Sequence, residues 1–147
     1  MMGQPILHKI FQINKKDFVH AGEASIHAKN LLKSLNLDAG LIRRVAICGY
    51  EGEMNVVMHG GEGHLSISIE KDRIVLQLSD NGPGIPDIEL ALQEGYSTAS
   101  DNFREMGFGA GMGLPNMKRN ADEFELSSRA GEGTEVHMVF FINAKGG

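Results

Sequence analysis

Two glycine-rich segments organise this sequence, and each leads into a predicted helix start. The first reads Asp80-Asn81-Gly82-Pro83-Gly84-Ile85-Pro86-Asp87, and the second reads Gly107-Phe108-Gly109-Ala110-Gly111-Met112-Gly113-Leu114-Pro115. Glycine allows positive φ angles and a close approach of the backbone to a ligand. A helix N-terminus offers free N–H groups and a partial positive charge, both of which suit phosphate. The pair predicts a nucleotide clamp with two anchors and a lid between them.

The chain reaches the first anchor through a predicted antiparallel hairpin. Residues 64–70 and 73–79 each alternate apolar and polar side chains, and Lys71-Asp72 forms the tight turn between them. Such alternation is typical of strands with one buried face. The predicted inward side chains are Leu65, Ile67, Ile69, Ile74, Leu76 and Leu78. Asp80 then stands at a strand end, where its carboxylate can accept a hydrogen bond from an amine.

Beyond the first anchor, a short helix, a polar loop and a second helix are predicted. Pro86 suits the first turn of a helix that ends near Glu94. Residues 95–106 show no periodicity, and a polar segment of this length inside a compact domain is usually a functional loop. We expect disorder over residues 97–105. The second helix is predicted over residues 114–121.

Three more strands are predicted at the two ends of the chain. Residues 5–13 read as a first strand, with Leu7, Phe11 and Ile13 on one face. Residues 122–129 and 134–142 read as the last two strands, which a glycine-containing turn separates. Their predicted inward side chains are Phe124, Leu126, Val136, Met138, Phe140 and Ile142.

Two long helices are predicted between the first strand and the hairpin. Asn14 suits the cap of the first helix, with Asp17 three residues on, and the helix would run to about Leu35. Its apolar stripe would comprise Phe18, Ala21, Ser25, Ala28, Leu32 and Leu35. Asp38 suits the cap of the second helix, which is predicted over residues 39–59.

The order of these elements predicts the fold class. About five strands and three main helices, with two long helices in succession, do not form a repeating βαβ chain. We therefore predict an α+β fold, a two-layer α/β sandwich with helices on one face of a mixed, mostly antiparallel sheet. The length of 147 residues suits a single domain, residues 1–147, with one core.

Composition narrows the classes of function. The net charge of −5 argues against a broad basic surface for nucleic acid. A single cysteine, Cys48, excludes an internal disulfide and a cysteine-based zinc site, and it is predicted to be a core residue. No apolar run approaches the roughly 20 residues that a membrane-spanning helix needs. These features predict a cytoplasmic protein that does not bind a membrane.

The second long helix carries polar side chains in its interior. Glu51, Asn55 and His59 follow one another at intervals of four, so they share one helix face, whereas Glu53 points elsewhere. A structural polar face is one interpretation, since such pairs are common. The other is a metal and water site, because an Asn oxygen can bind Mg²⁺ beside phosphate and a carboxylate one turn away can accept a proton. For His59, contact with phosphate or substrate is one interpretation, and a histidine that balances the dipole at the helix C-terminus is the favoured one.

The glycine segments also have two interpretations. Asn81-Gly82 is a favoured hairpin turn, but a predicted helix follows it instead of a returning strand. The second segment lacks the Gly-Lys-Ser/Thr of a phosphate-binding P-loop, and Met112 stands where a dinucleotide fingerprint needs its third glycine. It could still bind phosphate at the start of the helix that follows.

Four motifs in order resemble one ATPase superfamily, that of DNA gyrase, heat-shock chaperones, histidine kinases and MutL. Glu51-x-x-x-Asn55, Asp80-x-Gly82-x-Gly84, Gly109-x-Gly111-x-Gly113 and Gly133-Thr134 are similar to its N, G1, G2 and G3 boxes. Within the superfamily, the chain resembles bacterial anti-sigma-factor serine/threonine kinases and the stressosome switch kinases. Further likenesses to the latter are Glu94-Gly-Tyr-Ser-Thr98 and Gly113-Leu-Pro-Asn-Met-Lys-Arg119.

The resemblance implies a role for each motif. Glu51 corresponds to the catalytic general base, Asn55 to the Mg²⁺ ligand and Asp80 to the residue that reads the adenine amine. Nucleotide contacts are expected at Asn55, Asp80, Gly82, Gly84, Ile85, Gly109, Gly111, Met112, Gly113, Leu114 and Thr134. Two departures stand out. Residues 101–106 lengthen the lid around Arg104, and Gly52 is a flexible neighbour for the base.

The implied function is an ATP- and Mg²⁺-dependent serine/threonine protein kinase of a partner-switching pathway. Its expected substrate is a small antagonist protein, and a sigma factor, a phosphatase and a second copy of the chain are further expected partners. The alternative is a non-catalytic module that uses ATP to control the binding of a sigma factor or another regulator.

Overall fold

The computed structural model describes residues 6–59, 61–85, 92, 113–129 and 131–142. The strands are β1 (Leu7–Ile13), β2 (Gly63–Ile69), β3 (Arg73–Asp80), β4 (Glu123–Arg129) and β5 (Gly133–Phe141). The helices are α1 (Glu23–Ser34), α2 (Ala39–His59) and α5 (Gly113–Asn120). The α+β prediction is confirmed.

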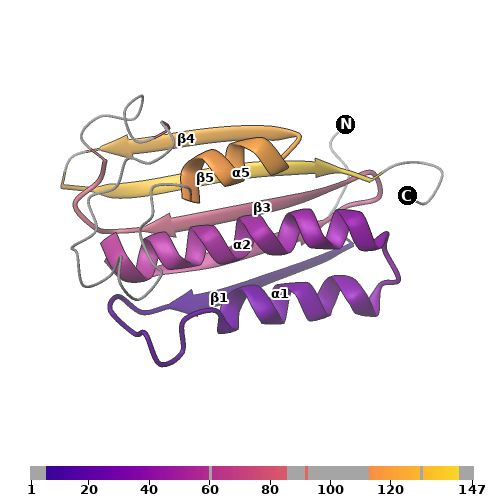
Figure 1. Ribbon diagram of the computed structural model, residues 1–147, viewed down its shortest axis with the longest axis horizontal. Coiled ribbons are helices and arrows are strands. Elements are labelled where there is room, and N and C mark those ends of the chain that lie inside the picture. The colour runs from indigo at the N-terminus through magenta and orange to yellow at the C-terminus, as the bar shows by residue number, and fades with distance from the viewer. Residues whose placement is uncertain (1–5, 60, 86–91, 93–112, 130, 143–147) are drawn as a thin grey trace.

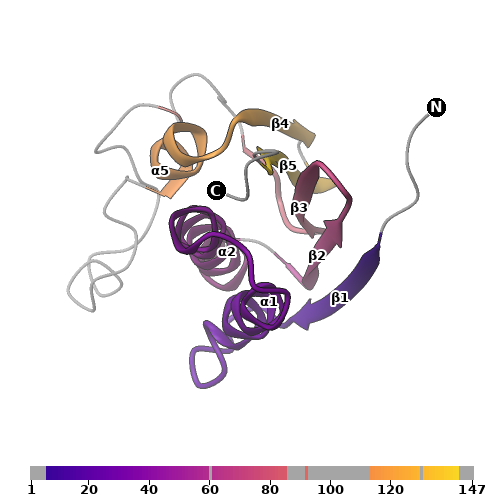
Figure 2. The ribbon, with the colours of Figure 1, turned by 90° about the vertical axis from the view of Figure 1, so that its right-hand side faces the viewer.

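The five strands form one sheet in the order β1-β2-β3-β5-β4. All four strand pairs in these residues are antiparallel. In the β2–β3 hairpin Ile69 pairs with Ile74, so the predicted hairpin and its turn at Lys71-Asp72 are confirmed. The three helices cover one face of the sheet, with α2 between α1 and α5 (Figures 1 and 2). This arrangement places α2 over the central strand β3, and α5 packs against α2 and β4.

The core lies between the helices and the inner face of the sheet. The predicted inward side chains of the hairpin are all buried, and the alternation continues on β5. From the helices, Leu32, Val45, Val56 and Met117 fill the other side. Leu32, Leu65, Met117 and Phe140 are each 0% exposed. A closely packed interior of this kind fixes how α2 lies against β3.

The glycine at position 52 serves this packing. A Cβ atom added there would lie 2.5 Å from Cγ of Leu78, so only glycine allows α2 to approach β3 this closely. Helix α2 continues through this position without a break as far as His59. Gly52 is therefore a contact point between helix and sheet, and this packing is a reason for a glycine at this position.

The start of the first helix differs from the prediction. Helix α1 begins at Glu23 and not after Asn14, and the chain from residue 14 to Gly22 is a loop. Gly22 adopts a left-handed conformation with φ of 99°. The side chain that caps the helix is Glu53 from α2, whose carboxylate accepts hydrogen bonds from the backbone N–H groups of Gly22, Ala24 and Ser25. The start of α1 is therefore set by a side chain distant in sequence, and not by the local capping signals at Asn14 and Asp17.

The other helix prediction near this point holds. Asp38 Oδ2 accepts the N–H of Leu41 at 3.0 Å, as an N-terminal cap does. Several other predictions lie outside the described residues. They are the helix over 86–94 apart from Leu92, the polar loop 95–106 with its expected disorder, Arg104, and the glycine segment as far as Met112.

Candidate functional site

Asp80 closes strand β3 with its carboxylate at the edge of the inner face. One oxygen, Oδ1, accepts the N–H of Gly82 at 2.8 Å, which forms an Asx turn. Within the described residues, Oδ2 accepts no hydrogen bond, so it remains open to an outside donor. A Cβ atom added to Gly63 would lie 3.1 Å from Cβ of Asp80 and 3.0 Å from Cγ1 of Val56. Asp80 therefore lies next to α2, close to Val56.

The loop after Asp80 is held against the β4–β5 turn. Gly84 has φ of 84°, and a Cβ atom there would lie 2.5 Å from the carbonyl oxygen of Arg129. Gly133 has φ of 119°, and an added Cβ atom would overlap the carbonyl oxygen of Asp80. These two positions require glycine because the two loops approach each other through their backbones.

The hydroxyl of Ser128 joins three parts of this region. Ser128 Oγ accepts the N–H of Ile85 at 2.6 Å and donates to the carbonyl oxygen of Gly133 at 3.1 Å. It also lies 3.0 Å from Oγ1 of Thr134, which pairs with Asp80 across strands β5 and β3. The G1 and G3 motifs, which are far apart in sequence, are therefore joined side by side.

A second group forms where α2 meets the start of α5. Gly113 is the first residue of α5. A Cβ atom added to Gly113 would lie 3.2 Å from Glu51 Oε2 and 3.3 Å from Asn55 Oδ1. Glu51 and Asn55 of the predicted helix face thus lie at the start of α5. Oxygen ligands beside free N–H groups are what an Mg²⁺-bound phosphate needs.

Burial sets the acidity of Glu51. Its carboxyl is half-buried, and the loss of hydration raises its pKa above the ordinary value of 4.5, while a hydrogen bond with the Asn116 side chain lowers it in part. Asn116 lies in the first turns of α5, and its Oδ1 accepts a hydrogen bond from Arg119 at 2.7 Å. The amide NH₂ of Asn116 is therefore the group available to Glu51. A carboxylate with a raised pKa is suited to accept a proton.

Sequence reasoning missed two residues of this site, Ser128 and Asn116. A signal for Ser128 exists, since it continues the inward face of Phe124 and Leu126, and a hydroxyl at the end of an apolar face needs a polar partner. Asn116 gives no comparable signal, because its contact with Glu51 depends on how α5 lies against α2. The predicted residues Leu114 and Ile85 both pack against the core.

Two other predictions on side-chain chemistry can be compared with the structure. Cys48 is buried, and burial raises the pKa of its thiol to about 12, so it is a core residue as predicted. Among the described residues, no cluster of three or more His, Cys, Asp or Glu side chains is arranged to hold a metal ion. An Mg²⁺ ion at Asn55 would need phosphate oxygens as further ligands. None of the helices in the described part of the chain is long and apolar enough to cross a membrane.

The fold and this site define a class of protein. An antiparallel sheet with helices on one face, a carboxylate and an amide one helical turn apart, and a glycine-lined helix start all point to an ATP-using domain. Residues 52–144 match the family model described as histidine kinase-, DNA gyrase B-, and HSP90-like ATPase. The chain belongs to this family.

Particular relatives narrow the class further. The chain is 35% identical over 118 residues to the serine/threonine-protein kinase RsbT of Bacillus subtilis (strain 168), which covers 78% of this chain and 83% of the relative. It is 34% identical over 99 residues to the anti-sigma F factor of Thermoanaerobacter sp. (strain X514), covering 64% of this chain and 66% of that protein. Among solved structures, the mycobacterial sensor histidine kinase MprB matches with a TM-score of 0.53 at 15% identity, over 93% of this chain and 99% of that chain. This last likeness shows the fold alone.

Proposed function

We propose that this protein is an ATP- and Mg²⁺-dependent serine/threonine protein kinase that phosphorylates a small antagonist protein in a partner-switching pathway. The observation that carries the proposal is the convergence of Glu51 and Asn55 on Gly113 at the start of α5. The similarity to RsbT supports the choice of a protein hydroxyl as the acceptor. A binding module without catalysis would need no carboxylate with a raised pKa at the phosphate end of its site.

Each residue of the site has a proposed role. Asp80 Oδ2 accepts a hydrogen bond from the exocyclic amine of adenine, and Thr134, Gly82, Gly84 and Ile85 form the surrounding wall. Asn55 holds Mg²⁺ through its side-chain oxygen. When bound, Mg²⁺ neutralises phosphate charge and orients the γ-phosphate, as in other phosphoryl transfers.

Glu51 acts on the acceptor. Its carboxylate accepts the proton of a serine or threonine hydroxyl as the hydroxyl oxygen bonds to the γ-phosphorus and the bond to the β-phosphate oxygen breaks. Gly113 keeps its side empty, because a Cβ atom would crowd both Glu51 and Asn55. The free N–H groups in the first turn of α5 carry partial positive charge, which favours the negative charge of the phosphates. Gly109, Gly111, Met112 and Leu114 complete the proposed set of nucleotide contacts.

The second candidate is an ATP-dependent binding module for a sigma factor, which the similarity to anti-sigma F factors favours. Incubation of the protein with radiolabelled ATP, Mg²⁺ and a candidate antagonist protein separates the two. Transfer of label to the antagonist supports the kinase, and tight ATP binding with no transfer supports the module.

The nucleotide site itself is tested by Asp80→Asn. The change keeps the size of the side chain but replaces an acceptor oxygen that faces the amine, and we expect ATP affinity to fall by roughly 10- to 100-fold, since buried charge-assisted hydrogen bonds contribute about 1.5–3 kcal/mol. Isothermal titration calorimetry measures it. Unchanged affinity for ATP would overturn the assignment of this site. Asn81→Asp, at an exposed neighbour, is the matched control.

A further inference from the structure

A groove opens on the helical layer between the α1–α2 junction and Glu51. Its volume is about 680 Å³, and its walls come from the second half of α1, the connection around Leu37 and the first three turns of α2. From Ala39 to Glu51 the helix advances by roughly 18 Å at 1.5 Å per residue. The wall that α2 contributes is therefore as long as about three helical turns.

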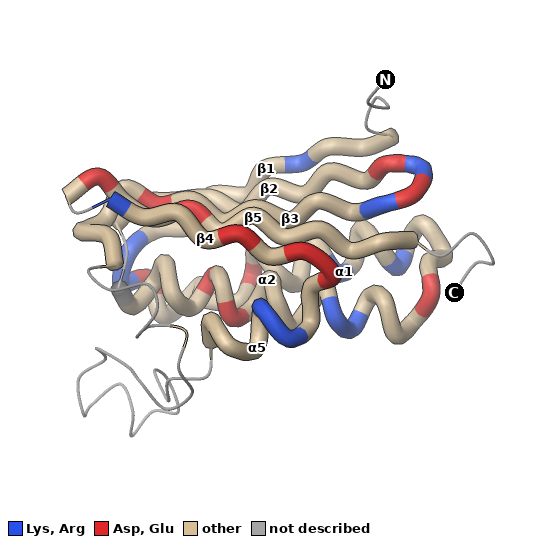
Figure 3. The backbone as a smooth tube through the Cα atoms, turned by 90° about the horizontal axis from the view of Figure 1, so that it is seen from above, with Lys and Arg blue, Asp and Glu red and all other residues tan. Residues whose placement is uncertain are grey.

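Positive charge lines one end of this groove. Lys29, Lys33 and Arg43 are all part of its walls. Within the described residues, none of the three forms an ion pair. The protein as a whole has a net charge of −5, so three unpaired cations in one groove are a local exception. Figure 3 marks the basic positions of the helical layer in blue, against the acidic positions along β4 in red.

The floor between the cations is apolar. Leu37, Ile42, Ala46 and Ile47 contribute to it. Tyr50 also lines the groove and is 44% exposed. An exposed aromatic side chain of this kind is typical of binding hot spots. A cationic rim over an apolar floor complements a segment with acidic and apolar side chains on one face.

Glu51 connects the groove to the nucleotide site. The same side chain lines the groove and lies beside Gly113 and Asn55. A hydroxyl carried along the groove would therefore reach the carboxylate that also lies beside the start of α5. We propose that this groove docks an acidic, apolar-faced segment of the protein substrate and directs its serine or threonine to Glu51. The inference rests on the proposed kinase function for the role of that hydroxyl.

The test reverses two exposed charges of the groove in Lys33→Glu/Arg43→Glu. The probe is the candidate antagonist protein, titrated into the ATP-bound full-length chain by calorimetry and then used as the phosphoacceptor. We expect its Kd and its KM to rise about tenfold or more, because charges at the rim of an interface steer and orient the partner. Affinity of the unaltered protein should also fall as salt is raised, and this dependence should weaken in the variant. ATP affinity and kcat should remain within about twofold.

Lys9→Glu/Lys71→Glu is the matched control, since both are exposed lysines that do not line the groove and the double reversal changes the net charge by the same amount. Tyr50→Ala tests the apolar part and should weaken binding by a similar factor. Equal Kd and KM in Lys33→Glu/Arg43→Glu and Lys9→Glu/Lys71→Glu would overturn the proposal, as would a lack of antagonist binding by the unaltered protein. If that protein binds the antagonist but transfers no phosphate, kinase function fails, and the groove is then judged on Kd alone.

Discussion

Two carboxylates two residues apart on α2 lie at the starts of two different helices, Glu53 at α1 and Glu51 at α5. Glu53 is 3% exposed and accepts three backbone N–H groups from Gly22, Ala24 and Ser25, at 2.9, 3.2 and 2.9 Å. Glu51 is half-buried beside Gly113 and Asn116, with a raised pKa. The fold occupies the oxygens of Glu53 and leaves those of Glu51 largely available. A buried carboxylate therefore marks chemistry only when the fold does not already use it.

The largest effect is expected from Glu51→Gln. The amide keeps the shape of the side chain but cannot accept the hydroxyl proton, so phosphotransfer to the antagonist should fall by about 10²- to 10⁴-fold. Single-turnover transfer of the γ-phosphate measures it. ATP affinity should stay close to that of the unaltered protein, and the urea midpoint should not fall, because the amide lacks the desolvation cost of the half-buried carboxylate. Full activity in this variant would exclude Glu51 as the base.

The opposite pattern is expected from Glu53→Ala. Removing the carboxylate leaves three buried N–H donors at the start of α1 without a partner, which should destabilise the fold by about 3 kcal/mol or more. The melting temperature should fall by roughly 6–12 °C. Urea unfolding measures the loss, and Glu62→Ala, at an exposed position, should stay within about 0.5 kcal/mol. A stable but inactive Glu53→Ala protein would reverse the assigned roles of the two carboxylates.

This contrast also explains what the sequence could predict. The β2–β3 hairpin, α2 with its Asp38 cap and the face shared by Glu51 and Asn55 all depend on local periodicity, and the structure has them where predicted. The start of α1 was misplaced because its cap, Glu53, lies about 30 residues along the chain from the N–H groups it binds. No local pattern records a contact of that range.

The same limit applies within the site. The order of the four motifs predicts the ATPase family, which the comparisons confirm. The link that Ser128 makes between Ile85 and Thr134, and the place of Asn116 beside Glu51, depend on how β4 and α5 pack. Apart from Glu51, the groove beside α1 contains no residue of the four motifs, because its walls come from the place where α1 and α2 meet.

The acidity of Glu51 should appear in the pH dependence of transfer. The carboxylate is the active form, so kcat/KM should rise with pH through a pKa above 4.5 and then level off. The hydrogen bond from Asn116 lowers that pKa. Asn116→Ala should therefore shift the acidic limb to higher pH, whereas Lys118→Ala, at an exposed position on the same helix, should leave it in place. A limb that stays fixed in Asn116→Ala would show that Asn116 does not act on Glu51.

The raised pKa of Glu51 also carries a sign for stability. The folded protein binds the proton of this carboxyl more tightly than the unfolded chain does, so stability from this group is lost as pH rises from 4.5 through the folded-state pKa. Glu51→Gln lacks that loss. Its stability relative to the unaltered protein should therefore be higher at neutral pH than at pH 4, as urea unfolding at the two pH values can measure.

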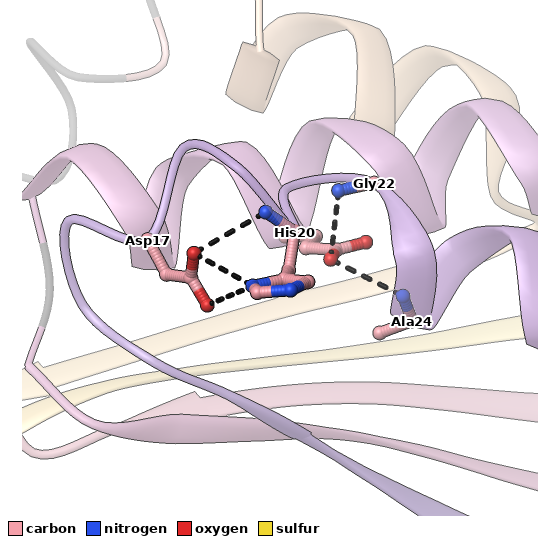
Figure 4. Close-up of polar contacts among 5 residues, drawn as sticks. Asp17, His20, Gly22 and Ala24 are labelled. Carbon is pink, nitrogen blue, oxygen red and sulfur yellow. Dashed lines mark hydrogen bonds and ion pairs between the residues drawn. The ribbon is translucent and has the colours of Figure 1, made fainter.

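The smallest effect on stability is expected from the exposed pair of Asp17 and His20. This pair lies in the loop before α1, which Glu53 binds on its buried side. Figure 4 shows Asp17 against His20 on one side of this loop, and the N–H groups of Gly22 and Ala24 directed at a carboxylate on the other. Asp17 Oδ2 lies 2.9 Å from His20 Nδ1, and this hydrogen bond raises the pKa of the exposed His20 ring above 6.5. Stability from the pair is present below pH 6.5 and is lost as pH rises through the raised pKa.

Asp17→Asn should return the pKa of His20 toward 6.5, which a pH titration of the imidazole proton resonances measures. Because solvent screens an exposed pair, the urea midpoint should change little at any pH. The same loop thus offers both kinds of contact, one buried and one exposed, within a few residues. If Asp17→Asn destabilised the protein as much as Glu53→Ala does, the loop would depend on its exposed pair, and burial would not be what separates a structural carboxylate from a dispensable one.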